Sequence, residues 1–264
     1  YLARREKGAP QLTAPGALGQ QLIARLPFAL TGAQRRVVDE IAQDLRQPYP
    51  MQRLLQGDVG SGKTLVALMS MLLAVDNGFQ ACMMAPTEIL AAQHYETIRK
   101  FLFGMNVRVE LLMGSVKGKK REKILKDLLT GDIQILIGTH AVLEDTVGFS
   151  SLGMVVIDEQ HRFGVDQRLA LRNKGVDNTT PHQLVMTATP IPRTLNMAMS
   201  GMRDLSIIAT PPAKRLAIKT FVREYDKAVI REAVLRELKR GGQVYFLHNE
   251  VETIENMREA LEEL

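Results

Sequence analysis

The sequence has very little cysteine and no tryptophan: Cys82 is the single cysteine among 264 residues. One cysteine excludes a disulfide within the chain and makes a cysteine-based zinc site implausible. Cys82 lies in the apolar stretch ACMMAP, so we expect a buried thiol in a reducing compartment. The sequence therefore points neither to a disulfide framework nor to a cysteine-based zinc site.

The sequence also lacks membrane and export signals. No apolar run is long enough to cross a membrane, and the first residues, YLARREKGAP, have no apolar core of a signal peptide. We therefore expect a cytoplasmic protein with no membrane partner. The chain does not begin with methionine, and we expect it to be a piece of something longer.

Charge of one sign is in small excess. The net charge is +5 and the isoelectric point is near 9.3, which mildly favours a polyanionic partner but does not identify nucleic acid. Hydrophobic residues make up 45% of the chain and charged residues 24%, as in an ordinary globular protein with a sizeable core.

Apolar runs alternate with amphipathic segments, such as 88–102 and 117–130, through most of the chain. This alternation predicts an α/β fold with a mostly parallel sheet and helices on both faces. The predicted strands occupy residues 52–56, 80–85, 107–112, 133–137, 153–157 and 183–187.

Composition divides the chain into four parts. Residues 1–27 read as a connector from a preceding region, and residues 28–208 as the main α/β domain. The stretch ATPPAKRL, residues 209–216, contains two prolines and reads as a linker. Residues 217–264 predict a strand at 217–223, a helix at 226–240, a strand at 243–247 and a helix at 250–263. Two strands do not make a stable parallel sheet, so we expect this part to be the truncated start of a second domain.

The stretch GDVGSGKT fits the spacing of a phosphate-binding loop between a strand and a helix. Glycines allow the tight turn in which backbone N–H groups surround a phosphate. Lys63 would reach the β- and γ-phosphates and Thr64 would ligate Mg²⁺, so we expect ATP and Mg²⁺ as cofactors. The predicted loop residues are Gly57, Asp58, Val59, Gly60, Ser61, Gly62, Lys63 and Thr64.

The stretch VVIDEQH places two adjacent acids at the end of an apolar strand, where α/β sheets display ligand-binding residues. Asp158 would hold Mg²⁺, and Glu159 would orient and deprotonate the attacking water. Gln160 and His161 follow and are placed to sense the γ-phosphate. With Lys63, these two acids form the predicted catalytic set.

Two further stretches belong to the expected nucleotide site. In FALTGAQ, the amide of Gln34 can pair with the N6 donor and N7 acceptor of adenine, and Phe28 opens the same stretch. In MTATPIPRT, the hydroxyls of Thr187 and Thr189 can bond to the acidic motif and to a neighbouring domain. This turn, which includes Arg193, would couple the nucleotide state to a bound polymer.

Two strand ends are candidates for nucleic-acid contact, APTEILAAQH and GTHAVL. A strand end followed by a helix N-terminus offers N–H groups and hydroxyls to a sugar-phosphate backbone. The same residues can equally be helix caps, and the basic run KGKKREK is usually a solvated helix face. The DNA-binding candidates are Pro86, Thr87, Gln93, Thr139 and His140.

The order of these motifs resembles the superfamily 2 helicases and translocases, which have two RecA-like lobes with ATP and Mg²⁺ between them. The stretches MAPTEILAAQH, IGTHAVLED and VIDEQHRFGVDQRLAL look like the RecG branched-DNA helicases. Residues after about 195, including LNMAMSGMRDLSII and REAVLRELKRGGQVYFLHNEVETI, look like the Mfd transcription-repair coupling factors. A join near residue 195 and an intermediate member of the group both remain open, although Ser61, where Mfd motors usually have Phe, favours RecG for the first lobe.

This resemblance implies an ATP-dependent translocase on double-stranded or branched DNA that acts in DNA repair or recombination. It assigns Arg162 and Phe163 to the coupling segment after the acidic motif. An Mfd-like protein would also engage RNA polymerase, through a domain outside this chain. The arginine finger is expected beyond Leu264, so we expect the chain by itself to be a weak or inactive ATPase.

Two other classes of protein remain as alternatives. A nucleotide- or DNA-binding module that does not hydrolyse ATP would need no catalytic carboxylate after the Mg²⁺ ligand, so Glu159 argues against it. A kinase or small-molecule ATPase would need an acceptor pocket, for which we see no motif.

Overall fold

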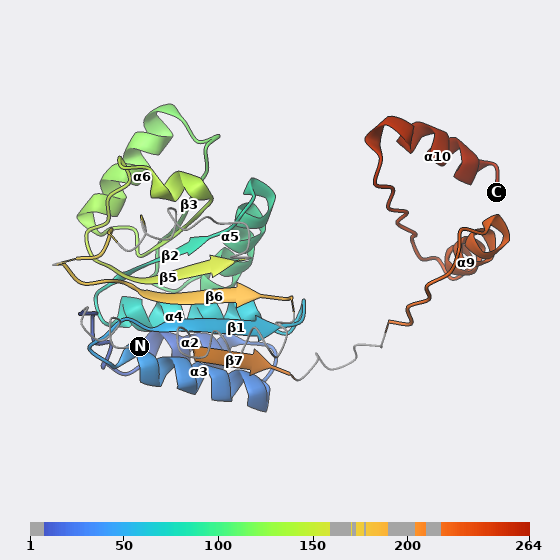
Figure 1. Cartoon of the computed structure of the whole chain (residues 1–264). Coiled ribbons are helices and arrows are strands. Elements are labelled where there is room, and N and C mark those ends of the chain that lie inside the picture. The colour runs from blue at the N-terminus through green and yellow to red at the C-terminus, as the bar shows by residue number, and fades with distance from the viewer. Residues whose placement is uncertain (1–7, 159–169, 171–172, 177, 190–203, 210–217) are drawn as a thin grey trace. The chain divides into compact units, whose positions relative to one another are not determined.

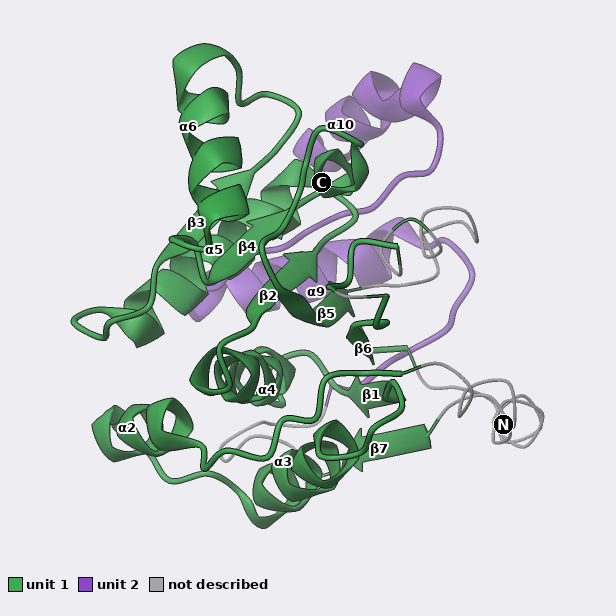
Figure 2. Ribbon diagram, turned by 90° about the vertical axis from the view of Figure 1, so that its left-hand side faces the viewer, with its two compact units in different colours: residues 1–214 green, residues 215–264 purple. Residues whose placement is uncertain are grey.

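The computed structural model describes residues 8–158, 170, 173–176, 178–189, 204–209 and 218–264. The chain divides into two compact units, Tyr1–Lys214 and Arg215–Leu264. Figures 1 and 2 show both units.

The first unit is built on a seven-stranded sheet with the order β3-β4-β2-β5-β6-β1-β7, in which every pairing is parallel (Figure 1). Six of these strands overlap the predicted ones, which confirms the parallel α/β fold. The strands are β1 (Gln52–Gly57), β2 (Gln80–Met84), β3 (Val109–Leu112), β4 (Ile135–Gly138), β5 (Leu152–Asp158), β6 (His182–Thr187) and β7 (Asp204–Ile208).

Both faces of the sheet are buried, because successive side chains of each strand belong to different apolar clusters. Leu55 and Met83 belong to one cluster, whereas the adjacent Leu54 and Cys82 belong to the other. Helix α6 (Gly118–Thr130) contributes to the second cluster. The helices that contribute to the first are α2 (Ala17–Arg25), α3 (Gly32–Leu45), α4 (Lys63–Asp76) and α5 (Glu88–Leu102). The prediction of helices on both faces is therefore confirmed.

Helix α4 follows the phosphate-binding loop and is the most deeply buried helix of the described chain. Its sequence, KTLVALMSMLLAVD, is apolar on nearly every side, and nine of its residues are buried. Such a helix is stable only when other elements surround it. It packs against strands β1, β2 and β5 and against helices α2 and α3 (Figure 2), so the loop at its start rests on the core.

The segment predicted as a connector contributes to this core. Leu12 and Leu22 are fully buried, and the imidazole of His182 joins the segment to the sheet. Its Nδ1 accepts from the Met51 N–H at 2.9 Å, and its Nε2 lies 2.6 Å from the Pro10 carbonyl oxygen, to which it donates. Residues 9–25 are thus packed on the first unit.

Strand β7 was not predicted. It pairs with β1 as the outermost strand of the sheet. Its sequence DLSII does not show which side chains face the core, because the polar Ser206 is buried while the apolar Ile207 is exposed. The strand is held by polar contacts instead: Arg53 Nη1 donates to Ser206 Oγ at 2.9 Å, and Ser206 Oγ donates to Glu40 at 2.5 Å.

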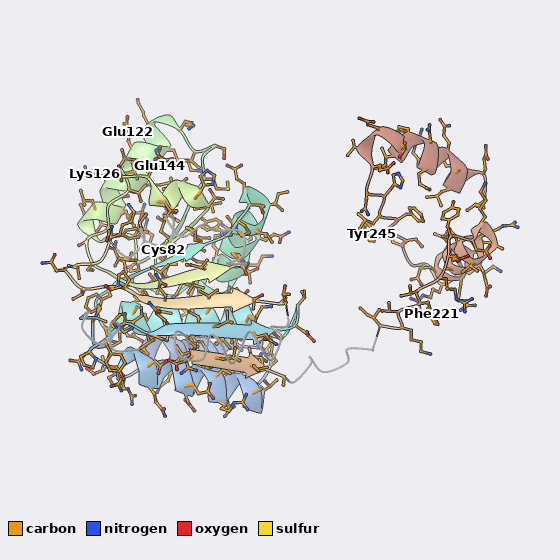
Figure 3. All side chains as sticks on the ribbon, viewed as in Figure 1. Cys82, Glu122, Lys126, Glu144, Phe221 and Tyr245 are labelled. Carbon is orange, nitrogen blue, oxygen red and sulfur yellow. The ribbon has the colours of Figure 1, made fainter. Side chains whose placement is uncertain are left out.

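The second unit contains helices α9 (Lys227–Lys239) and α10 (Ile254–Glu262), which confirms the two predicted helices. The predicted strands at 217–223 and 243–247 are wrong: residues 218–223 and 243–247 form no strand. A strand needs a neighbour to pair with, and no strand is present among the described residues of this unit. Phe221 and Tyr245 are consequently exposed (Figure 3).

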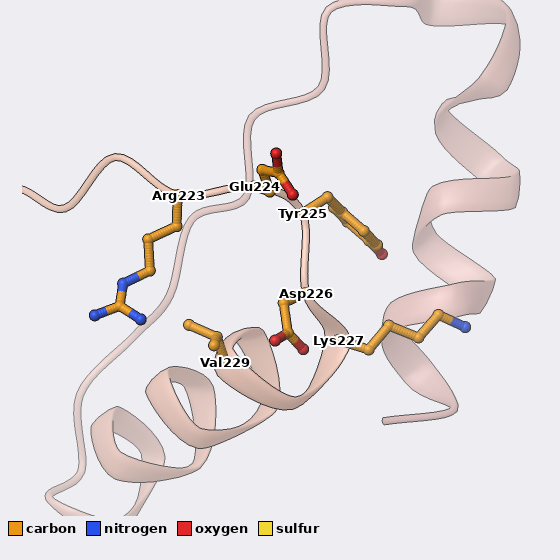
Figure 4. A pocket seen from close by; sticks show the side chains of 6 residues that line it. All are labelled: Arg223, Glu224, Tyr225, Asp226, Lys227 and Val229. Atoms are coloured by element: carbon orange, nitrogen blue, oxygen red, sulfur yellow. The ribbon is translucent and has the colours of Figure 1, made fainter.

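An open hollow lies at the start of α9 in the second unit (Figure 4), and none of the predicted site residues lines it. Its walls are formed by Arg223, Glu224, Tyr225, Asp226, Lys227 and Val229. Asp226 is the N-cap of α9 and accepts from the Ala228 N–H at 2.8 Å, so its carboxylate has a structural role there.

The single cysteine and the lengths of the helices bear on the remaining expectations. Cys82 is fully buried in β2 (Figure 3), as predicted, and burial raises the pKa of its thiol to about 12. In the described part of the chain, none of the helices is both long and apolar enough to span a bilayer.

Candidate nucleotide site and nucleic-acid interface

The predicted phosphate-binding loop connects the end of β1 to the start of α4, and its shape depends on glycine. Gly60 and Gly62 have φ values of 79° and 86°, which L-residues with side chains rarely adopt. A Cβ at Gly62 would lie 2.1 Å from Gln34 Nε2, and one at Gly57 would lie 2.6 Å from Ser61 Oγ. The loop therefore folds into a close cradle whose backbone conformation favours glycine at Gly60 and Gly62.

Several groups of the loop suit a phosphate. Helix α4 begins with Gly62 as N-cap and no side-chain cap, and the N-terminus of a helix favours an anion. Lys63 Nζ donates to the Gly57 carbonyl at 2.5 Å, which places the ammonium group inside the loop. Ser61 Oγ is buried and, within the part of the chain that the structure describes, has no hydrogen-bond partner. Thr64 lies half-buried in the first turn of α4.

Gln34 lies against this loop rather than in solvent, with an exposed fraction of 7%. Its Nε2 donates to the Ser61 carbonyl at 2.9 Å, and its Oε1 accepts from the Thr31 N–H at 2.9 Å as part of a capping box for α3. Each end of an amide can form one further hydrogen bond, so these contacts leave capacity for adenine. Phe28, six positions before Gln34, is exposed to solvent. The contact of these two residues with adenine remains a prediction.

Asp158 is the last residue of β5, and the phosphate-binding loop begins at the end of β1. Both therefore lie at the carboxyl ends of the parallel strands. The Cα of Asp158 is level with Met186 of β6, which is level with Leu55 of β1. Two strand spacings, about 10 Å, separate β5 from β1. A carboxylate and the Thr64 hydroxyl are oxygen donors of the kind that Mg²⁺ prefers, so the residue types fit a magnesium–nucleotide complex.

An unpredicted residue, His94 of α5, contacts Asp158. His94 Nε2 and Asp158 Oδ2 are 2.6 Å apart, and the side chains are 14% and 9% exposed. The sequence contains a signal for this contact: His94 falls between Ala91 and Ile98 on the buried stripe of its helix, where a polar side chain needs a partner.

Several predicted residues cannot be placed. Glu159, Gln160, His161, Arg162, Phe163 and Arg193 lie outside the described residues. Of the turn after β6, the Thr189 N–H donates to Thr187 Oγ1 at 3.1 Å. The Thr187 hydroxyl therefore has a local partner within the turn, and its link to the acidic motif stays a prediction.

The DNA-binding candidates fall into two groups. Thr87 before α5, Gln93 within α5 and His140 after β4 are exposed, and Pro86 is half-buried. Thr87 also caps α5 by accepting from the Leu90 N–H at 3.2 Å. Thr139 differs, because its side chain is only 1% exposed and its hydroxyl is buried. Thr139 directly follows β4 and its hydroxyl is packed inside, so the DNA contact of this residue stays a prediction that the hydroxyl does not support in this arrangement.

Glu88 joins two of the loops at the carboxyl ends of the strands, where the DNA-binding candidates lie. Its Oε1 accepts from the Ser115 N–H at 3.3 Å, so the start of α5 is tied to the turn after β3. The ends of β2, β3 and β4 thus form one continuous face, next to the nucleotide site at the ends of β5 and β1.

A parallel sheet with a glycine cradle before a buried helix, and a carboxylate at the neighbouring strand end, defines a P-loop nucleotide-binding domain. The family model of the DEAD/DEAH box helicases matches residues 31–198. The chain belongs to this family.

Relatives within the family fall into the two groups that the motifs resemble. The chain is 51% identical over 240 residues to the transcription-repair-coupling factor of Escherichia coli, covering 90% of the chain and 20% of that protein. It is 49% identical over 244 residues to the ATP-dependent DNA helicase RecG of Pasteurella multocida, covering 90% of the chain and 35% of that protein. The chain thus spans between a fifth and about a third of these relatives.

A solved structure of RecG bound to a three-way DNA junction resembles the chain over nearly all of its length. The TM-score is 0.86 at 39% sequence identity, and the match covers 99% of this chain and 35% of that one.

Proposed function

We propose that this chain is the nucleotide-binding lobe, and the beginning of the second lobe, of an ATP-dependent translocase on double-stranded DNA that acts in repair or recombination. The observation that carries the proposal is the glycine cradle at residues 57–62, which lies with Asp158 at the carboxyl ends of the parallel strands. The family match and the likeness to a RecG structure support the same activity.

The chemistry assigned to each residue follows from its place. Bound Mg²⁺ would offset the negative charge on the β- and γ-phosphates. Lys63 and the first N–H groups of α4 hold the phosphates, while Asp158 and Thr64 orient the metal side of the complex. Glu159 directly follows Asp158 in sequence, and we assign it the role of accepting a proton from the attacking water.

DNA is the proposed polymer, and double-stranded or branched DNA is the proposed substrate. The RecG structure that resembles this chain is bound to a three-way DNA junction. Thr87, Gln93 and His140 present hydroxyl, amide and imidazole groups at one face. Such groups contact the sugar-phosphate backbone without reading sequence, as a translocase requires.

A second candidate function is transcription-repair coupling, favoured by the 51% identity to the E. coli factor. It would add RNA polymerase as a partner. We prefer the RecG-like function because the RecG structure covers 99% of the chain. Either function places the protein in the cytoplasm with the DNA.

The direct test is titration calorimetry of the 264-residue chain with ADP and Mg²⁺. Lys63→Ala removes a cation inside the phosphate cradle, and we expect binding to weaken by about tenfold or more. Lys119→Ala, on the exposed start of α6, is the matched control and should bind as the parent does. Equal affinity of the Lys63 variant and the control would contradict the proposed site.

A further inference from the structure

Helix α5 carries one polar side chain in the middle of its buried stripe. Ala91 and Ile98 on this stripe are fully buried, and His94 lies between them. Helix α5 follows β2, and β2 pairs with β5 along its length, so the stripe passes beside the end of β5. His94 is the residue of α5 that meets the carboxylate at that end.

The hydrogen bond has a defined direction. An ionised carboxylate only accepts hydrogen bonds, so the 2.6 Å contact requires His94 Nε2–H to donate to Asp158 Oδ2. The bond uses one of the two carboxylate oxygens and is therefore compatible with ligation through the other. Residues that hydrogen-bond a metal ligand in this way orient it and tune its affinity.

The helix that carries His94 also begins at the proposed DNA face. Thr87, the N-cap of α5, precedes His94 by seven positions, which is two helical turns. Thr87 and His94 therefore lie on the same side of one rigid element. One end of that side is at the exposed loop, and the other contacts the nucleotide-site carboxylate.

We propose that His94 is a positioning residue of the ATPase site. It holds the Asp158 carboxylate in the orientation that a magnesium–nucleotide complex needs, and it fixes that carboxylate to the DNA-facing helix α5. The inference rests on the proposed nucleotide site. It assigns His94 no contact with ATP, DNA or the reacting atoms.

A purely structural role for His94 makes a different prediction. If the hydrogen bond only fastened α5 to the sheet, its loss would lower stability without changing how nucleotide binding depends on Mg²⁺. If His94 positions Asp158, its loss weakens the binding of ADP with Mg²⁺ and leaves the binding of ADP in EDTA nearly unchanged. The ratio of the two affinities distinguishes the roles.

The experiment compares two substitutions of similar size in the 264-residue chain. His94→Gln keeps an N–H donor on a side chain of similar length, whereas His94→Leu fills the space without a donor. Glu96→Gln, an exposed position on the same helix, is the control. ADP affinity is measured with Mg²⁺ and with EDTA, and thermal unfolding is followed for each protein.

We expect His94→Leu to lower the affinity for ADP with Mg²⁺ by about tenfold and to change the affinity in EDTA by less than about twofold. His94→Gln should recover most of the loss. Equal Mg²⁺ dependence in the Leu variant and the parent would overturn the role of His94 and leave the proposed site intact. If the Leu variant does not fold, the Gln variant decides: a loss of Mg²⁺ dependence despite the retained donor would overturn the inference. A parent chain whose affinity for ADP does not depend on Mg²⁺ would instead contradict the proposed function itself.

Discussion

At the scale of single residues, the phosphate cradle depends on backbone conformations that few side chains tolerate. Gly62 is the critical position because it combines a φ of 86° with close contact to Gln34. Gly78, after α4, has a similar φ of 80° but nothing within 4 Å of an added Cβ. A substitution at Gly78 would therefore cause backbone strain alone, whereas one at Gly62 would cause the same strain and also displace a neighbouring side chain.

We predict that Gly62→Ala and Gly78→Ala both destabilise the fold by about 1–2 kcal/mol, because each places an L-residue in the left-handed region. The Gly62 variant should also lose nucleotide affinity, since its Cβ displaces the Gln34 amide that holds the Ser61 carbonyl. Thermal unfolding and ADP titration measure the two effects. Normal nucleotide binding by the Gly62 variant would show that the cradle does not need this glycine.

The residues of the site were predictable to different degrees. The loop residues follow a spacing that the sequence displays directly, because residues 57–64 contain all of them, and Asp158 is marked by the apolar strand that it ends. His94 was missed because its partner is 64 positions away, and only the packing of α5 beside β5 brings the two together. Thr139 was predicted as a DNA contact from its place at a strand end, and the sequence does not show that the packing after β4 buries its hydroxyl.

At the scale of elements, polar contacts rather than apolar alternation fix the edge of the sheet. Arg53 of β1 donates to Asp44 and to Ser206, and Ser206 donates to Glu40. Arg36 of α3 also donates to the Ile207 carbonyl at 2.8 Å. Strand β7 is thus held by contacts to residues more than 150 positions earlier, which explains why its own sequence did not predict it.

Ser206→Ala should therefore destabilise the protein by about 1–3 kcal/mol, because Arg53 and Glu40 each lose a partner in a partly buried setting. The free energy of unfolding in urea measures this effect. Ser150→Ala is a suitable control because Ser150 is exposed, and such changes usually alter stability by less than about 0.5 kcal/mol. Equal stability of the two variants would contradict the role given to Ser206.

At the scale of the whole molecule, the two units differ in how completely their elements are paired. Seven strands of the first unit share one sheet, and the predicted strands there were confirmed because each has neighbours. The apolar stretches of the second unit, including residues 243–247, have the composition of strands. They are exposed and pair with no strand among the described residues. Local sequence predicts the tendency to form a strand, whereas the neighbours decide whether it forms.

We propose, as the central claim, that this lobe hydrolyses ATP only as half of an ATP-driven motor that DNA stimulates. Phosphoryl transfer needs positive charge on both sides of the γ-phosphate, and Lys63 is assigned to one side. We propose that an arginine of a complete second lobe supplies the other. Such an arginine contributes on the order of a thousandfold or more in rate.

Phosphate release from three proteins tests this claim: the 264-residue chain, a longer protein with a complete second lobe, and that longer protein carrying Glu159→Gln. We predict little hydrolysis by the short chain with or without duplex DNA, and DNA-stimulated hydrolysis by the longer one. The Gln variant should bind ATP without hydrolysing it, because the amide keeps the shape of the side chain but cannot accept a proton. Brisk DNA-stimulated turnover by the short chain, or unchanged turnover in the Gln variant, would contradict the account.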